Sequence, residues 1–299
     1  MERKTHIIGA ASGWGAQVPT CEDGPDALKE AGTLASLKDA GVSIEAWDTL
    51  YPQVKFKEGS LPLPERLPII AELSARLAGK VSKTLQEGEF PVVLCGDHAN
   101  AVGTWNGVGR ECEPLGLIWI DAHMDSHTPE TTPSGAWHGM PLAALLGYGA
   151  PALAQLTREN PILRPEHLCL IGIRSFEEGE AALLKLLQVK IYFIDEVQRR
   201  GLKTVLAEAI GYVKQAAGGF GVSLDVDSVD PSEAPGVGTP EENGLSADEL
   251  LGALTLLQDE ERLQAFELVE FNPHLDKNRA TLKLCQRILE TVLRERKHG

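Results

Sequence analysis

Short apolar segments rich in Val, Ile and Leu recur along the chain, and amphipathic stretches separate most of them. Several of these segments are apolar at nearly every position, which is typical of parallel strands that helices cover on both faces. The predicted strands are residues 5–11, 42–47, 90–95, 115–120, 167–173, 190–194, 221–225 and 265–271. The predicted helices are residues 26–40, 69–87, 204–214, 247–258 and about 277–296. This alternation predicts an α/β fold: a single domain over residues 1–299 with a doubly wound, mostly parallel, eight-stranded sheet and helices on both faces.

The composition narrows the choice of partners and compartment. The chain has 28 Lys and Arg against 43 Asp and Glu, a formal net charge of −15, which disfavours contacts with nucleic-acid phosphates. The five cysteines are widely scattered without a C-x-x-C motif, as is typical of free thiols in a reducing cytosol. No segment has the length and apolarity of a signal peptide or a membrane span. We therefore expect a cytoplasmic protein that binds neither nucleic acid nor membranes.

Acidic residues and histidines gather where three predicted strands end. The residues concerned are His98, Asp121, His123, Asp125, Asp225 and Asp227. Side chains two positions apart on an extended chain point to the same side, so the residues of each cluster are expected to converge. Two long loops rich in Gly, Pro and Thr, residues 121–141 and 231–244, follow strand ends, where open α/β sheets bind their ligands. Residues 51–68, rich in Pro and Lys, are predicted to form a surface loop.

Six such side chains exceed what one divalent ion can use while it keeps a position open for chemistry. A pair of ions about 3.5–4 Å apart, sharing a carboxylate and a hydroxide, accommodates all of them. Oxygen and nitrogen ligands without a thiolate favour Mn²⁺ over Zn²⁺. A single D-x-H or D-x-D is usually a capping or solvated motif, but four carboxylates gathered without cations would cost on the order of several kcal/mol per charge. The sequence therefore predicts two Mn²⁺ per subunit.

The motifs around these residues resemble those of the arginase (ureohydrolase) family over nearly the whole chain. They are Gly-Asp-His at 96–98, Asp-Ala-His-Met-Asp at 121–125, Ser-Gly-Ala-Trp-His-Gly-Met-Pro at 134–141, Ser-Leu-Asp-Val-Asp at 223–227, Gly-Thr-Pro at 238–240 and Glu-Phe-Asn-Pro at 270–273. The resemblance implies an arginase-like fold that forms a homotrimer or homohexamer. It also implies hydrolysis of L-arginine to L-ornithine and urea by attack of a metal-bridging hydroxide.

The same resemblance implies individual roles. One ion would be bound by His98 and Asp125 and the other by His123 and Asp227, with Asp121 and Asp225 bridging. The catalytic residues would be His138 as a proton shuttle, Asp125 as a proton donor and Glu270 as the anchor of the guanidinium group. The substrate contacts would come from His127, Ser134, Glu177, Glu180, Thr239 and Glu270.

Three positions depart from the family pattern. Arginases usually have Asn in place of His127 and Ala136, and Asp in place of Glu177. Because all three lie where the amino-acid end of the substrate is recognised, the alternative is a ureohydrolase acting on another guanidino or amidino compound, as agmatinases and guanidinobutyrases do. His127 points either into the site or to solvent, and the acidic run that includes Glu177 and Glu180 also has the pattern of a solvated helix start.

Two other functional classes are weaker. A two-metal phosphoesterase would need basic residues or a backbone nest to bind phosphate, and the two long loops contain no Lys or Arg. A non-catalytic binding protein would not need all six ligands together with His138. Trp105, Trp119 and Trp137 are predicted to serve packing.

Overall fold

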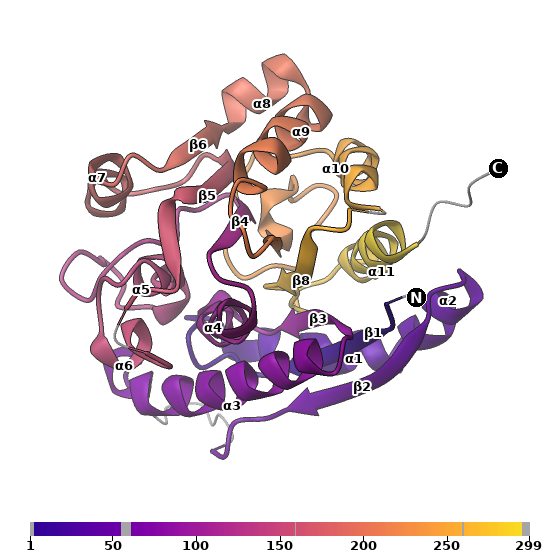
Figure 1. Cartoon of the computed structure of the whole chain (residues 1–299), viewed down its shortest axis with the longest axis horizontal. Helices are drawn as coiled ribbons and strands as arrows, with labels where there is room; N and C mark the ends of the chain where they lie inside the picture. Colours follow the sequence, from indigo (N-terminus) through magenta and orange to yellow (C-terminus); the bar gives the residue numbers. More distant parts are fainter. Residues whose placement is uncertain (1–2, 55–60, 159, 259, 295–299) are drawn as a thin grey trace.

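One parallel sheet organises the computed structural model, which describes residues 3–54, 61–158, 160–258 and 260–294. The eight strands pair in the order β2-β1-β3-β8-β7-β4-β5-β6 (Figure 1). Their bounds are β1 Thr5–Ala10, β2 Ile44–Leu50, β3 Phe90–Cys95, β4 Leu115–Ile120, β5 Leu163–Ile173, β6 Lys190–Phe193, β7 Phe220–Asp225 and β8 Leu263–Val269. Every pair of neighbouring strands is parallel, so the predicted α/β sheet is confirmed.

Helices cover both faces of the sheet, and successive strand residues enter two different apolar cores. Ile118 packs in one core, whereas its neighbours Leu117 and Trp119 pack in the other. The first face is covered by α1 Gly24–Glu30, α2 Thr33–Asp39, α8 Ile194–Arg200, α9 Leu202–Val213, α10 Ala247–Leu254 and α11 Ala280–Leu293. The second face is covered by α3 Leu67–Gln86, α4 Ala101–Glu111, α5 Pro141–Leu145 and α7 Glu178–Leu186, and the short α6 Pro151–Ala154 lies beyond them. Figure 1 shows α3, α4 and α5 on one side of the sheet and α9, α10 and α11 on the other.

Several predicted helix bounds are wrong. The helix predicted over 26–40 is two helices, because Gly32, with φ 81°, breaks the chain between α1 and α2. The helix predicted over 247–258 ends at Leu254 and continues as a 3₁₀ turn. The last helix is α11, and positions 295 and 296 of its predicted span lie outside the described residues. The predicted loop 51–68 includes residues 55–60, which also lie outside them, and its end forms a 3₁₀ turn and the start of α3.

The four central strands of the sheet are those that carry the predicted motifs. They are adjacent in the order β3-β8-β7-β4, although they lie far apart in the sequence. Because all strands are parallel, their carboxyl ends meet at one edge of the sheet, the usual ligand-binding edge of an open α/β fold. This topology places the candidate site at the centre of that edge.

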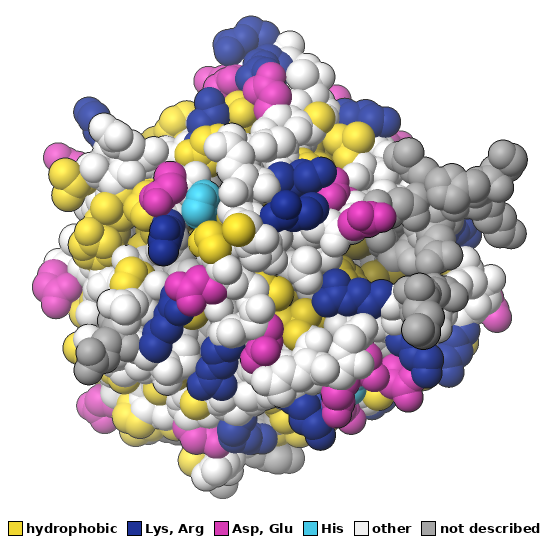
Figure 2. Space-filling model, in the orientation of Figure 1, with side chains coloured by type: hydrophobic (Ala, Val, Ile, Leu, Met, Phe, Trp, Pro, Cys, Tyr) yellow, Lys and Arg dark blue, Asp and Glu magenta, His cyan; other side chains and the backbone are white. Residues whose placement is uncertain are grey.

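No helix in the described ranges has the length and apolarity needed to cross a membrane. On the face of the molecule shown in Figure 2, basic and acidic side chains are interspersed rather than gathered by sign.

Candidate metal centre and substrate cavity

The same local structure follows β3, β4 and β7. At each strand end, an aspartate accepts the backbone N–H of the residue two positions further on, which turns the chain across the sheet edge. The hydrogen bonds run from Ala99 N to Asp97 Oδ1 (2.9 Å), from His123 N to Asp121 Oδ1 (2.7 Å) and from Asp227 N to Asp225 Oδ1 (2.8 Å). These turns direct the side chains of three separate strand ends toward one point.

The first cluster surrounds the buried imidazole of His98. Its Nδ1 atom lies 3.2 Å from Asp121 Oδ2, 2.9 Å from Asp125 Oδ2 and 3.1 Å from Asp225 Oδ2. Asp125 reaches this position from a left-handed backbone, with φ 47°. One nitrogen and several carboxylate oxygens thus face a common point, as the ligands of a divalent cation do.

The second cluster adjoins the first and shares Asp121 with it. His123 Nδ1 lies 3.4 Å from Asp121 Oδ1 and 3.1 Å from Asp227 Oδ2. Thr239 donates a hydrogen bond to the same Asp227 oxygen at 3.0 Å. Since the two oxygens of Asp121 face different histidines, this residue has the geometry of a bridging ligand.

The electrostatics of both clusters fit bound cations. Burial, together with the charges of Asp227 and Asp121, raises the pKa of Asp225, and burial with the Asp121 charge raises the pKa of Asp125 to about 6. His98 Nδ1 and Asp227 Oδ1 are buried, and neither makes a hydrogen bond with another described residue. Divalent cations would offset this crowding of negative charge and bind the atoms that lack hydrogen bonds.

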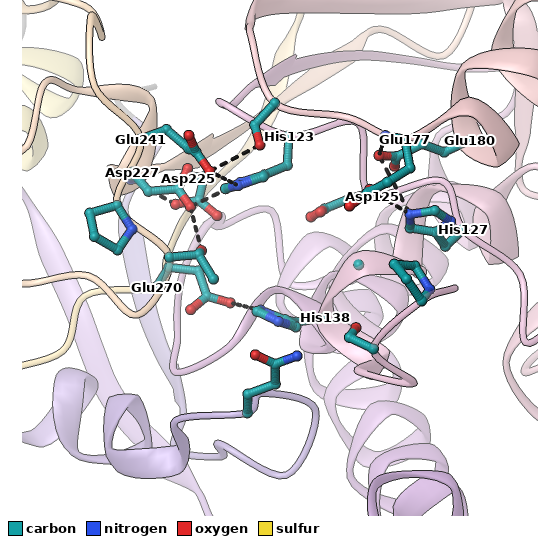
Figure 3. A pocket seen from close by; sticks show the side chains of 17 residues that line it. His123, Asp125, His127, His138, Glu177, Glu180, Asp225, Asp227, Glu241 and Glu270 are labelled. Carbon is teal, nitrogen blue, oxygen red and sulfur yellow. Dashed lines mark hydrogen bonds and ion pairs between the residues drawn. The ribbon is translucent and has the colours of Figure 1, made fainter. Parts of the chain in front are cut away.

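A cavity of about 300 Å³ opens next to the clusters. In Figure 3, His123, Asp225 and Asp227 lie at one end of it, His127, Glu177 and Glu180 at the other, and Asp125 between them. The cavity is lined by Gln17, His123, Asp125, His127, Pro133, Ser134, His138, Gly139, Ser175, Glu177, Glu180, Asp225, Asp227, Thr239, Pro240, Glu241 and Glu270. Among the described residues, many carboxylates and no Lys or Arg face the cavity, so it favours a cationic ligand.

Glu270 and His138 form a hydrogen-bonded pair inside the cavity (Figure 3). Glu270 Oε1 accepts hydrogen bonds from His138 Nδ1 at 3.0 Å and from the His98 backbone N–H at 2.9 Å. Burial opposes the protonation of His138, but the charge of Glu270 and their hydrogen bond raise its pKa to about 9. Burial also favours the neutral acid at Glu270, yet His138 and the His98 N–H lower its pKa overall. The pair therefore holds an ionised carboxylate beside a protonated imidazole.

The far end of the cavity is built around His127, which points into the site rather than to solvent. Its Nε2 lies 2.9 Å from Glu177 Oε2, and its Nδ1 lies 3.1 Å from Thr131 Oγ1. Glu180 accepts the backbone N–H groups of Glu177 at 3.0 Å and Ser126 at 3.3 Å, and its burial raises its pKa to about 8. The acidic run does start a helix, α7, but Glu180 is only 3% exposed, so a solvated role for it is wrong.

Ser134 lies at the exposed mouth of the cavity, where its Oγ accepts the Ala136 backbone N–H at 3.2 Å. With it, every residue predicted for the site lies in the cavity wall or in the clusters beneath it.

A family model, related sequences and solved structures each match nearly the whole chain. The family model described as Arginase family matches residues 3–294. Arginase from Bacillus caldovelox is 40% identical over 293 residues, covering 97% of this chain and 98% of that protein. The chain belongs to the arginase family. A solved structure of the Bacillus caldovelox arginase superposes with a TM-score of 0.91 at 38% identity, covering 99% of both chains. The crystal structure of arginase from Bacillus subtilis gives 0.90 at 36% identity, covering 99% of this chain and 100% of that one.

The contact between His127 and Glu177 joins two of the three positions that are expected to depart from the arginase pattern. Their side chains form a hydrogen-bonded pair. The third departure, Ala136, is buried. His127 and Glu177 lie at the end of the cavity away from His123 and Asp227.

Some functional contacts were not predicted from the sequence of this arginase-family chain. Trp119 packs as predicted, but its indole also stacks on His98 at 4.0 Å and donates to Asp121 Oδ2 at 2.9 Å. Ser223 and Glu267 contact each other beneath His98 and were not singled out. An acidic residue inside the apolar run of β8 was the available signal for Glu267, because a charge there needs partners. Trp137 does not line the cavity and donates instead to the Leu63 carbonyl at 2.6 Å.

Proposed function

We propose that this chain is an arginase: a hydrolase, formed by one catalytic domain over its 299 residues, that converts L-arginine and water to L-ornithine and urea. The observation that carries the proposal is the cavity in which Glu270 lies beside two adjoining His and Asp clusters. Near-full-length similarity to named arginases supports the same reading.

His98, Asp121, Asp125 and Asp225 would hold one divalent ion, and His123, Asp121, Asp225 and Asp227 the other. When bound, such a pair supplies water activated for attack on the guanidinium carbon. We propose Mn²⁺ as the metal, because the donors are imidazole and carboxylate without a thiolate.

Side chains in the cavity would bind the guanidinium group and transfer protons. Glu270 Oε1 is occupied by two hydrogen bonds, whereas its Oε2 accepts none from the described residues and is free to bind the guanidinium as a charge-assisted pair. Asp125, which lies between the two ends of the cavity and beside the clusters, can carry a proton to the departing amine. His138, at the solvent side of Glu270, can exchange that proton with bulk water.

The other end of the cavity would hold the amino-acid portion of the substrate. Glu177 and Glu180 offer carboxylates to an α-ammonium group, and the hydroxyl of Ser134 can donate to an α-carboxylate. His127 fixes the position of Glu177 through their hydrogen bond. Thr239 braces Asp227 at the opposite end, next to the expected guanidinium.

The cellular compartment is proposed from the cysteine content, and the oligomeric state from the family. Five free cysteines suit a reducing cytoplasm. A homotrimer or homohexamer is proposed from the family resemblance alone.

The test measures urea release by Mn²⁺-loaded protein with arginine, agmatine and guanidinobutyrate as parallel substrates, and counts metal ions per chain. The proposal expects two ions and a kcat/KM for arginine well above the other two values. A preference for agmatine or guanidinobutyrate would replace it with the alternative that the departures at His127, Ala136 and Glu177 left open. No urea from any of the three would refute both.

A further inference from the structure

A carboxylate lies in the interior of the sheet, beneath the metal ligands. Glu267 on β8 is completely buried, and its strand neighbours Phe266 and Leu268 are apolar. In the described ranges no ion pair joins Glu267 to a Lys or an Arg. A buried carboxylate is costly unless hydrogen bonds compensate for lost hydration, so its partners reveal its role.

The register of four neighbouring strands places Glu267 in a row of residues that crosses the sheet. Across β4, β7, β8 and β3, Trp119 lies opposite Ser223, Ser223 opposite Glu267, and Glu267 opposite Val93. Ser223 Oγ donates to Glu267 Oε2 at 2.6 Å, and Trp105 Nε1 on α4 donates to the same oxygen at 2.9 Å. Two donors on one oxygen hold the carboxylate in a fixed orientation.

The surrounding core leaves room for this arrangement. A Cβ atom at Gly221, two residues before Ser223 on β7, would lie 2.0 Å from the Trp105 ring. Trp105 can therefore occupy this position, with its indole N–H bonded to Glu267, only because residue 221 has no side chain.

The row connects to the metal centre through His98. Its Nε2 lies 3.0 Å from Ser223 Oγ. The single hydroxyl proton of Ser223 is donated to Glu267, so the Ser223 oxygen can only accept a hydrogen bond from the N–H at His98 Nε2. The opposite ring atom, Nδ1, then presents its lone pair to the carboxylates of the first cluster. Stacking on Trp119, with ring planes 5° apart, fixes the plane of the imidazole.

We infer that Glu267 is a positioning residue for the ion at His98: acting through Ser223, it holds His98 in the tautomer whose Nδ1 binds metal. Metal-bound histidines are commonly oriented by a carboxylate on the other ring nitrogen, and here a serine hydroxyl extends that contact by one step. The inference rests on the proposed two-ion function, but concerns the affinity for metal rather than the choice of substrate.

The experiment compares Mn²⁺ binding by the full-length protein and by Ser223→Ala, Glu267→Gln and the double variant. Free Mn²⁺ is followed by electron paramagnetic resonance during titration, which resolves the two sites without using activity. Each single variant should weaken one of the two sites about 10- to 100-fold and leave the other near its original affinity. Because both residues act through one chain of hydrogen bonds, the double variant should be no weaker than the weaker single variant.

The matched control is Ser74→Ala, the same substitution at a fully buried serine on α3, away from the row. It should leave both sites unchanged. Urea unfolding in chelator distinguishes positioning of His98 from a purely structural role. A purely structural role would lower the unfolding free energy without a selective loss of Mn²⁺ affinity at one site. Ser223→Ala is the smaller change and keeps the test decisive if Glu267→Gln does not fold.

Unchanged binding in Ser223→Ala, or additive losses in the double variant, would overturn the inference and leave the proposed function intact. Failure of the original protein to bind two ions would overturn both. Normal binding with no urea production would refute the proposed function alone.

Discussion

Glu270 and Asp125 carry their carboxylates on left-handed backbone, with φ 67° and 47°. Such a conformation costs about 1–3 kcal/mol at a residue other than glycine and persists only where the surroundings enforce it. At Glu270 the enforcing contacts are its own N–H, bonded to the Gly96 carbonyl at 2.8 Å, and its side chain, bonded to the His98 N–H. The carboxylate is therefore held in position before any substrate arrives, which reduces the ordering needed on binding.

Glu270→Gln should lower kcat/KM for arginine about 100-fold, because a charge-assisted hydrogen bond to the guanidinium is replaced by a neutral one. Gln keeps an oxygen that can accept the His98 N–H, so folding should be preserved. Steady-state urea release measures the effect. The control is Glu242→Gln, at an exposed residue outside the cavity, which should behave as the original protein. Equal kcat/KM for both variants would remove Glu270 from the substrate contacts.

His138→Asn should make stability less dependent on pH in metal-free protein. The pKa of His138 is raised from 6.5 to about 9 in the folded state, so its contribution is fully present below about pH 6.5 and is lost as pH rises through 9. The original protein should be more stable than the variant by about 3 kcal/mol near pH 6, and this difference should vanish near pH 10. Urea unfolding in chelator across this range provides the values. A stability difference between the original protein and His138→Asn that stays constant from pH 6 to pH 10 would contradict the assignment.

Residue identities at the site could be predicted from the sequence, but their geometry could not. Asp121, His123 and Asp125 do converge, yet the predicted reason, an extended chain, is wrong. The strand ends at Ile120, and the convergence comes from an aspartate turn and the left-handed backbone of Asp125. Ser223 stands first in the motif at 223–227, but its contact with Glu267 could not be predicted, because that contact arises from the register of two strands that are distant in sequence.

At the scale of elements, the segment after β1 links the metal clusters to His138. Gly15 donates its N–H to Asp97 Oδ2 at 2.8 Å, and its carbonyl accepts the N–H groups of Trp137 at 2.9 Å and His138 at 3.2 Å. Asp97 itself belongs to the turn that presents His98. One residue of a loop thus sets the distance between two parts of the site.

Gly15→Ala should misplace His138. The added Cβ would lie 2.6 Å from both Ala99 Cβ and Asp97 Oδ1, so the segment must move. We expect unfolding free energy to fall by about 1–3 kcal/mol and kcat/KM by roughly 10- to 100-fold. Gly79→Ala on α3 is the matched control: a Cβ there meets nothing within 4 Å, and helix propensity predicts a gain of up to about 1 kcal/mol with unchanged activity. An active Gly15→Ala enzyme would show that the segment does not position His138.

Strands were easier to predict than helices in this fold. Segments such as Phe90–Cys95 and Leu115–Ile120 are buried on both faces, so their composition alone identifies them. α4 was not predicted, because its sequence contains three glycines that disfavour a helix in isolation. It forms because Gly103 lets it approach α3 closely: a Cβ there would lie 2.7 Å from the Ser74 carbonyl oxygen. Tertiary packing overrides propensity at this helix.

At the scale of the whole molecule, the strand order determines where negative charge gathers. The order β3-β8-β7-β4 brings the carboxylates of Asp121, Asp125, Asp225 and Asp227 to one point of the sheet edge. The fold therefore concentrates negative charge in its own centre, at a cost that bound cations would offset. Stability and metal binding should be coupled through this site.

Removing divalent ions with chelator should lower the unfolding free energy, and Mn²⁺ should restore it. An ion present at 100 times its dissociation constant adds about 2.7 kcal/mol per site when only the folded state binds it. Two sites therefore predict a gain of about 5 kcal/mol, measured as the difference between urea unfolding curves in Mn²⁺ and in chelator. Asp227→Asn removes a ligand from the second cluster only, so about half of this gain should remain. Equal stability with and without Mn²⁺ would mean that the buried carboxylates are compensated within the chain, and that the strand ends do not form a metal centre.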